Sequence, residues 1–281
     1  MATTTPARSA PVFRRPARRL PFPLGLYQTY VGKKWVMGVT GIALLGYVVV
    51  HMIGNLHLYE GPAQVNHYGE ALRDLGGELV PRTLLLWLLR IGLTTAFVLH
   101  IHAAISLTAT NRKANGTRYQ SKRDYIAADF ASRSMRVTGI IIFLYVIFHL
   151  ADLTWGWLLG DEYIRGDVYH NVVESLSSLP IAIIYIVANI AVAVHIYHGA
   201  WSMFQTLGIN NPRFNVARRY LATGLAAMIL LGNLSFPIMV QAGLISEDDR
   251  TTPYADEEHG EEGESGEAAP AATTTEEGAL G

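Results

Sequence analysis

The chain has 281 residues, of which 50% are hydrophobic and 16% are charged, and its mean hydropathy of +0.22 is too high for an ordinary soluble domain. Its 22 Lys and Arg and 23 Asp and Glu nearly cancel, so net charge gives no indication of nucleic acid or of acidic substrates. The chain contains no cysteine, which excludes disulfides, thiolate nucleophiles, iron–sulfur ligation and c-type haem attachment within it, and leaves His, Met or oxygen atoms to hold any metal.

Residues 1–30 are a basic arm that is rich in proline. No apolar run follows its arginines, so a cleaved signal peptide is not expected. We interpret this arm as largely flexible. Its arginines are Arg8, Arg14, Arg15, Arg18 and Arg19.

Residues 31–245 contain five segments that are apolar enough to span a membrane. A bilayer core about 30 Å thick requires about 20 apolar residues in a helix. Pro180 precedes the fourth segment, where proline suits a first helical turn, and Pro237 is expected to kink or end the fifth. The predicted fold class is therefore an all-α membrane protein, a bundle of five transmembrane helices. The segments are Trp35–Leu56, Leu84–Thr108, Val137–Leu159, Ile181–Leu207 and Tyr220–Val240.

Basic residues are concentrated in alternate connections, and cytoplasmic connections are enriched in them. The chain before Trp35 holds seven, the second connection seven and the fourth three. The opposite connections hold only Arg73, Arg82, Arg165 and Arg250, among many acidic residues. This pattern predicts a cytoplasmic N-terminus and an outer C-terminus in a cell membrane. Residues 246–281, rich in Glu, Ala, Thr and Gly, are predicted to be a disordered acidic outer tail.

Six of the ten histidines lie in the predicted spans, where ionisable residues are costly unless paired or ligated. One such histidine alone could simply bond to a neighbouring helix carbonyl. Four helices carrying one each favour a cage for haem iron, with neutral imidazoles as axial ligands. Counting about 1.5 Å per residue from the cytoplasmic end of each helix places His51 and His149 roughly 20–25 Å away, in the outer half of the membrane. The same count places His102 and His195 roughly 15–18 Å away, nearer the inner side.

Two helices offer a choice of histidine. His100 and His102 are about 200° apart around their helix, so both cannot face one haem. The face of His102 carries small or polar residues, whereas that of His100 carries Leu93, Phe97 and Leu107 and is expected to face lipid, so we predict His102 as the ligand. His195 and His198 share a face, so either could bind iron while the other serves a propionate or quinone.

Four runs together resemble one family: HMIGNL from His51, HAAISL from His102, RVTGIIIFLYVIFHL from Arg136 to His149, and HIYHGAWSMFQTLG from His195. That family is the five-helix, dihaem cytochrome b membrane anchor of succinate:quinone oxidoreductases, which include succinate dehydrogenase and fumarate reductase. The resemblance spans roughly residues 30–243.

The resemblance implies two haems b. It places the ligand of the fourth helix at His195, pairs His51 with His149 for the distal haem, and pairs His102 with His195 for the proximal one. It implies flavoprotein and iron–sulfur partner subunits on the cytoplasmic side that carry FAD, the iron–sulfur clusters and the dicarboxylate chemistry. Electrons from succinate would pass through the iron–sulfur subunit and the haems to quinone, with menaquinone the quinone of similar dihaem anchors. It also implies a bacterial cytoplasmic membrane.

One position departs from the family pattern. Some members carry a glutamate for proton movement two residues before the ligand of the fourth helix, and this chain has Ala193 there. Proton transfer by that route is therefore not expected.

Several further residues have both a functional and a simpler interpretation. Arg90 could contact a haem propionate or quinone, or reach the membrane surface. Asn55 could bond across helices beside a haem, and Asp152 could serve a quinone or proton step, or simply lie at the interface. Glu70, near Asn66 and Tyr68, could relay quinone protons or be a solvated loop residue. Trp201 and Ser202 could border an inner quinone pocket, or Trp201 could belong to an aromatic belt.

Two other functions fit the pattern of histidines. One is the dihaem anchor of another membrane oxidoreductase, such as a hydrogenase or formate dehydrogenase. The other is a haem-free transporter whose histidines relay protons or bind a metal.

Overall fold

The structure is a computed structural model and describes residues 21–22, 24–114, 126–209 and 211–251. This part of the chain is helical and contains no strand. Five of its helical segments are long and apolar enough to cross a membrane. The prediction of an all-α protein with five helices that could span a membrane is therefore confirmed for the described residues. The long helices are α2 (Tyr30–Asn55), α4 (Leu84–Ala114), α5 (Ile126–His149), α7 (Leu179–Thr206) and α8 (Asn215–Gln241).

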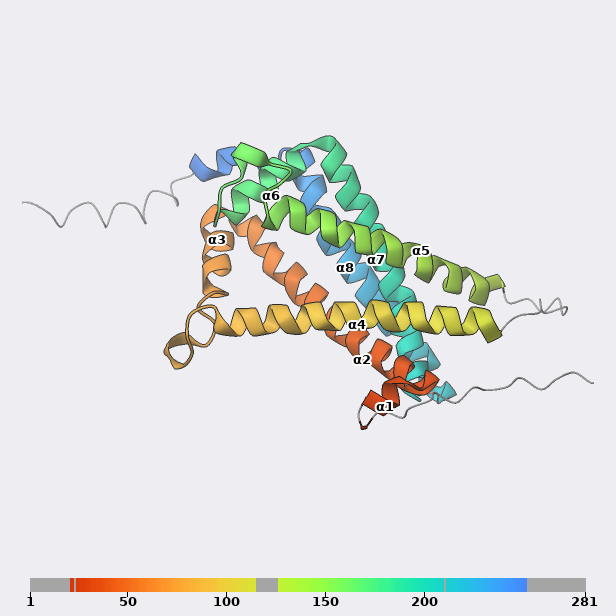
Figure 1. Ribbon diagram of the computed structural model, residues 1–281. Coiled ribbons are helices and arrows are strands. Elements are labelled where there is room, and N and C mark those ends of the chain that lie inside the picture. The colour runs from red at the N-terminus through yellow and green to blue at the C-terminus, as the bar shows by residue number, and fades with distance from the viewer. Residues whose placement is uncertain (1–20, 23, 115–125, 210, 252–281) are drawn as a thin grey trace, which may run out of the picture.

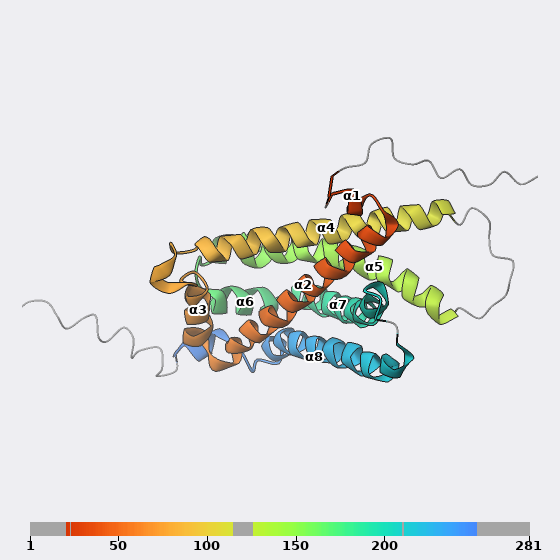
Figure 2. The same cartoon turned by 90° about the horizontal axis from the view of Figure 1, so that it is seen from below.

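The long helices pack into one bundle (Figures 1 and 2). Helix α7 packs against both α5 and α8, and α2 packs against α4 while also meeting α7 and α8. The short α1 (Leu24–Tyr27), the end of α4, the start of α5 and the start of α8 lie at one end of the bundle. The loops that contain α3 (Pro62–Ala71) and α6 (Val168–Ser177) lie at the other end.

The third span ends differently from its prediction. Regular helix was expected to Leu159, but α5 ends at His149 and a π-helical turn, η3 (Leu150–Thr154), follows. Gly156, with φ +68°, then turns the chain in a left-handed conformation that suits glycine. Pro237 does not end the fifth helix, because α8 continues to Gln241. Helices α3 and α6 were not predicted.

The predicted boundaries of the arm and the tail also need correction. Residues 24–27 form α1, and residues 247–251 form the 3₁₀ helix η6. Tyr169 of α6 donates to the carbonyl of Ser246 and to Asp249 Oδ2, at 3.0 Å each. Burial and the Asp249 carboxylate raise the pKa of Tyr169, so this hydroxyl remains a donor. Residues 1–20 and 252–281, which include most of the predicted flexible segments, lie outside the described residues.

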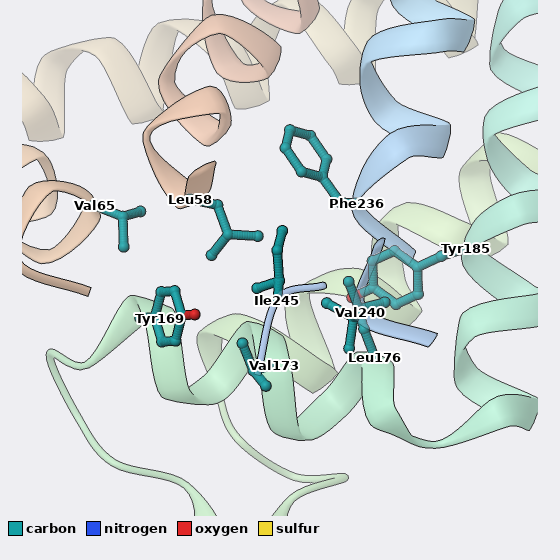
Figure 3. Close-up of a cluster of buried hydrophobic side chains, with 9 residues drawn as sticks. All are labelled: Leu58, Val65, Tyr169, Val173, Leu176, Tyr185, Phe236, Val240 and Ile245. Carbon is teal, nitrogen blue, oxygen red and sulfur yellow. The ribbon is translucent and has the colours of Figure 1, made fainter. Parts of the chain in front are cut away.

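A hydrophobic cluster closes the end of the bundle that carries α3 and α6 (Figure 3). It joins the end of α2 and its short 3₁₀ extension η1 (Leu56–Glu60) to α3, α6, α7 and α8. Its side chains are Leu58, Val65, Tyr169, Val173, Leu176, Tyr185, Phe236, Val240 and Ile245. Burial of these side chains fixes the loops over the two helix ends that carry His51 and His149.

Asn66 connects the two loop helices. Its Oδ1 accepts from the backbone N–H groups of Val168 and Tyr169 at 2.8 and 3.2 Å, in the first turn of α6. Its Nδ2 donates to Asp167 Oδ1 at 3.1 Å. The side chain therefore satisfies helix N–H groups that have no partner within their own helix.

Replacing Asn66 with alanine is expected to destabilise the protein by about 1–3 kcal/mol, because two half-buried N–H groups lose their acceptor. The thermal unfolding midpoint of the purified protein measures the effect. Gln64→Ala, at an exposed position on the same helix, is the matched control. An equal midpoint for the two variants would contradict this role of Asn66.

Candidate functional site

Two histidines from different helices face each other near the end of the bundle that carries the hydrophobic cluster. His51 is on the last turn but one of α2, and His149 is the last residue of α5. Their ring centroids are 5.9 Å apart and their ring planes are 74° apart. Both side chains are half-buried. We call this the outer pair.

A second pair lies farther along the bundle, between α4 and α7. His100 and His195 have ring centroids 6.5 Å apart and ring planes 64° apart. Both are half-buried. We call this the inner pair. The rings of Phe97 on α4 and Phe143 on α5 stack on each other, with centroids 6.4 Å apart.

The structure does not place His102 on the interior face of α4, where the sequence led us to expect it, and places His100 there. His102 is exposed, and its Nδ1 lies 2.5 Å from the hydroxyl of Tyr27 on α1. Partial burial raises the pKa of Tyr27, so the phenol remains protonated. His102 therefore contacts the last residue of α1 and is not brought to His195.

The physical reason lies in how hydroxyl groups are satisfied in a helix. Thr95, taken as a marker of the interior, donates to the carbonyl of Ile91 at 2.8 Å and is exposed. A threonine that bonds back to its own helix can face lipid. The interior face instead carries Leu93, Phe97 and His100, with Ala103 and Leu107 buried.

The inner pair has a uniform hydrogen-bond arrangement. His100 Nδ1 lies 3.1 Å from the carbonyl of Met37, which can only accept, so this nitrogen carries the proton. Thr40 Oγ1 is a second neighbour at 3.2 Å. His195 Nδ1 lies 3.1 Å from Thr138 Oγ1, whose own proton goes to the carbonyl of Ser134 at 2.7 Å. Both rings therefore keep Nε2 free to bind a metal.

The outer pair has different neighbours. His149 Nδ1 lies 3.2 Å from the hydroxyl of Tyr185, which donates to Asp152 Oδ2 at 2.8 Å. The Asn55 amide nitrogen lies 3.1 Å from His51 Nδ1. Asn55 thus contacts a histidine of its own helix and not, as the sequence suggested, a neighbouring helix. An amide that rotates by 180° presents its oxygen to this ring instead.

These pairs fit a haem held by two axial histidines. A metal between two imidazoles has bonds of about 2 Å to each nitrogen, which places the ring centres roughly 6 Å apart, as both pairs do. Glycines lie against the inner rings: a Cβ on Gly41 would be 3.3 Å from His100 Cε1, and one on Gly139 would be 3.7 Å from His195 Cε1. Within the described residues, no group of three or more His, Cys, Asp or Glu side chains could hold a metal, so a site with three such ligands is not formed there.

Arg90 and His198 lie outside both pairs. Arg90 is exposed and its guanidinium lies over the Trp87 ring, 5.2 Å from the centroid. Together with Ile91, Thr94 and Thr95 these residues line a shallow hollow of about 210 Å³ on α4. His198 is half-buried one turn after His195, with its ring against Tyr197.

Glu70 belongs to an ion-pair cluster in the loop before α4. One carboxylate oxygen pairs with Arg73, and the other lies 2.7 Å from Arg82, which also binds Asp74 at 2.7 Å. Asn66 is used to cap α6, as described above. The structure therefore does not bring these two residues together as a proton relay.

Trp201 and Ser202 lie near the end of α7. The guanidinium groups of Arg218 and Arg219 lie 5.8 and 5.6 Å from the centroid of the Trp201 ring. Arg218 is buried and donates to the carbonyls of Ile209 and Asn211, so it closes the loop between α7 and α8. Ser202 is exposed and donates to the carbonyl of Gly199 in its own helix.

The sequence interpretation missed the residues that hold the histidine rings. Thr40, Thr138 and Tyr185 are polar side chains inside predicted spans, one from each of three helices. Each contacts the Nδ1 of a paired histidine. Their polarity within apolar segments was the signal that could have identified them.

Residues 110–234 match the family model described as succinate dehydrogenase/fumarate reductase transmembrane subunit. The matched segment includes α5, α7 and most of α8, and therefore His149 and His195. No curated protein and no solved structure matches the chain. The match confirms the resemblance to membrane anchor subunits of this family.

Proposed function

Starting from this resemblance to the transmembrane subunit of succinate dehydrogenase/fumarate reductase, we propose that the chain is the membrane anchor and electron-transfer subunit of a succinate dehydrogenase. The observation that carries the proposal is the presence of two facing histidine pairs at two levels of one helix bundle. We propose that His51 and His149 hold one haem b, and that His100 and His195 hold the other.

The protein's own contribution is to fix and insulate these ligands. Met37 and Thr138 accept the Nδ1 protons of the inner pair, which sets the tautomer and leaves Nε2 as the nitrogen that would bind the iron. The surrounding apolar helices exclude water and so influence the reduction potential. When bound, the two haems would supply one-electron carriers between an iron–sulfur partner and a quinone, with menaquinone the type that the resemblance implies.

The partners follow from what the chain lacks and from its charge. It contains no cysteine for iron–sulfur clusters, so those clusters and FAD belong to partner subunits in this proposal. The end of α4, which carries Arg112 and Lys113, and the start of α8, which carries Arg218 and Arg219, lie at the same end of the bundle (Figure 1). We propose that this end is cytoplasmic and faces the soluble subunits, in a bacterial cytoplasmic membrane.

A spectrum of the purified complex tests the proposal. We expect a reduced-minus-oxidised difference spectrum of b-type haem and, on extraction, two haems b per chain. Copurification of flavoprotein and iron–sulfur subunits with succinate:quinone activity distinguishes it from the anchor of another dihaem oxidoreductase. A colourless protein would overturn the proposal and favour a haem-free transporter.

Thr138→Val is expected to weaken retention of the inner haem about 10–100-fold, because His195 loses the acceptor that fixes its ring. The rate of haem transfer to an excess of apomyoglobin measures this loss. Thr94→Val is the control, since Thr94 is an exposed membrane threonine that bonds only to the carbonyl of Arg90. Equal rates for the two variants would contradict the role of Thr138.

A further inference from the structure

Asp152 is a fully buried carboxylate located three residues after His149. We infer that Asp152, acting through Tyr185, is a positioning residue that strengthens His149 as an axial ligand and lowers the midpoint potential of the haem held by the outer pair. This inference rests on the proposed function, because it presupposes a haem between His51 and His149.

The contacts form a continuous chain. Ser175 and Tyr185 both donate to Asp152 Oδ2, at 2.5 and 2.8 Å. Since the single proton of the Tyr185 hydroxyl goes to Asp152, its oxygen accepts from His149 Nδ1 at 3.2 Å. The carboxylate is thus connected to the ligand ring through one phenol, and it fixes the orientation of every proton between them.

Burial makes this carboxylate effective. Asp152 is 0% exposed, and its Oδ1 is buried without a hydrogen-bond partner among the described residues. Both hydrogen bonds at Oδ2 are donated to Asp152, so in this arrangement the side chain acts as an acceptor. A buried negative charge interacts more strongly with its surroundings than one in water.

The backbone is shaped to place this group. The π-helical turn η3 begins at Leu150, immediately after His149, and carries Asp152. Such turns are rare and occur frequently at functional sites. Ser175 is on α6 and Tyr185 on α7, so three segments converge on one oxygen atom.

The inner pair provides the contrast. Its Nδ1 atoms bond to the neutral Met37 carbonyl and to threonine hydroxyls, and the threonine protons end on backbone carbonyls. Only the outer pair, among the described residues, is connected to a carboxylate in this way. Hydrogen bonding of a ligand imidazole to an anion raises its basicity, which stabilises ferric over ferrous iron.

A redox titration of the complete complex tests the inference. Asp152→Asn keeps the size of the side chain and removes its charge, and Tyr185→Phe keeps the ring and breaks the chain. Both variants are expected to retain two haems and to raise the midpoint potential of the outer haem while that of the inner haem is unchanged. In the double variant, the midpoint potential of the outer haem should shift no further than in Tyr185→Phe alone. In Asp152→Glu, which keeps the carboxylate, this potential should lie closer to the original value than in Asp152→Asn.

The low-spin ferric signals in electron paramagnetic resonance spectra give a second readout, because they report the axial ligands of each haem separately. We expect the outer signal alone to change in Asp152→Asn and Tyr185→Phe. Ser175→Ala is the matched control, since it removes a donor to the same oxygen but leaves the connection to His149 intact.

Three results would overturn the inference. They are an unchanged outer potential with both haems present, loss of the outer haem in both single variants, and an upward shift in Ser175→Ala as large as that in Asp152→Asn. The haem content of the wild-type complex is a separate measurement, because it tests the proposed function and not the role of Asp152. A wild-type complex without haem would instead overturn the proposed function.

Discussion

Replacing His100 with alanine is expected to lower the haem b content from two per chain to one, whereas replacing His102 leaves it unchanged. His100 faces His195 with ring centroids 6.5 Å apart, and its Nδ1 proton is fixed by the Met37 carbonyl. His102 is exposed and binds Tyr27 instead. In the proposed site, loss of one axial histidine would remove half of the protein coordination of the iron, which is a larger effect than loss of a hydrogen bond to a ligand ring.

Haem extraction and the reduced-minus-oxidised spectrum measure this difference. The two variants are matched controls for each other, since both remove an imidazole from the same helix within one turn. Loss of haem on replacement of His102, together with a normal haem content on replacement of His100, would contradict this prediction. It would favour His102 as the axial ligand.

Replacing His149 with glycine is expected to remove the outer haem and to leave the inner one in place. The two pairs share no histidine, so loss of the outer haem should leave the inner haem bound. Added imidazole should restore the missing haem, because it can occupy the space of the deleted ring and use the Tyr185 hydroxyl as its acceptor. Quinone reduction by the complex should fall sharply in this variant and recover with imidazole.

The control for this experiment is His67→Gly, at an exposed histidine on α3. Spectra recorded with and without imidazole give the haem content of each variant. Failure of imidazole to restore haem in His149→Gly, with a normal unfolding midpoint, would indicate that His149 is not an axial ligand.

The membrane-spanning helices could be predicted because their signal is long and repeated. Twenty or so apolar residues in succession identify a span whatever its neighbours are. The ends were less accurate, since α4 extends to Ala114 and α5 gives way to a π-helical turn at Leu150. The loop helices α3 and α6 were missed because they are short and contain many polar residues, and contacts such as those of Asn66 help to hold them.

The histidine pairs could be predicted only in part. Depth along each helix placed His51 with His149, but the rotation of α4 depended on which face was taken as the interior. Small and polar residues were interpreted as marking the interior face, although Thr95 satisfies its hydroxyl group within its own helix. The neighbours of the rings could not be predicted, because Thr40 and His100 are 60 positions apart in sequence and meet only through the packing of α2 on α4.

The position of α4 has a consequence for how the protein is assembled in the cell. This helix packs chiefly against α2, yet it supplies His100 to a pair whose other member is on α7. A haem bound there would fasten α4 to the rest of the bundle, and a ligand that binds only the folded form stabilises that form. Without this haem, α4 would be held chiefly by its packing on α2, so haem binding between His100 and His195 would complete the bundle.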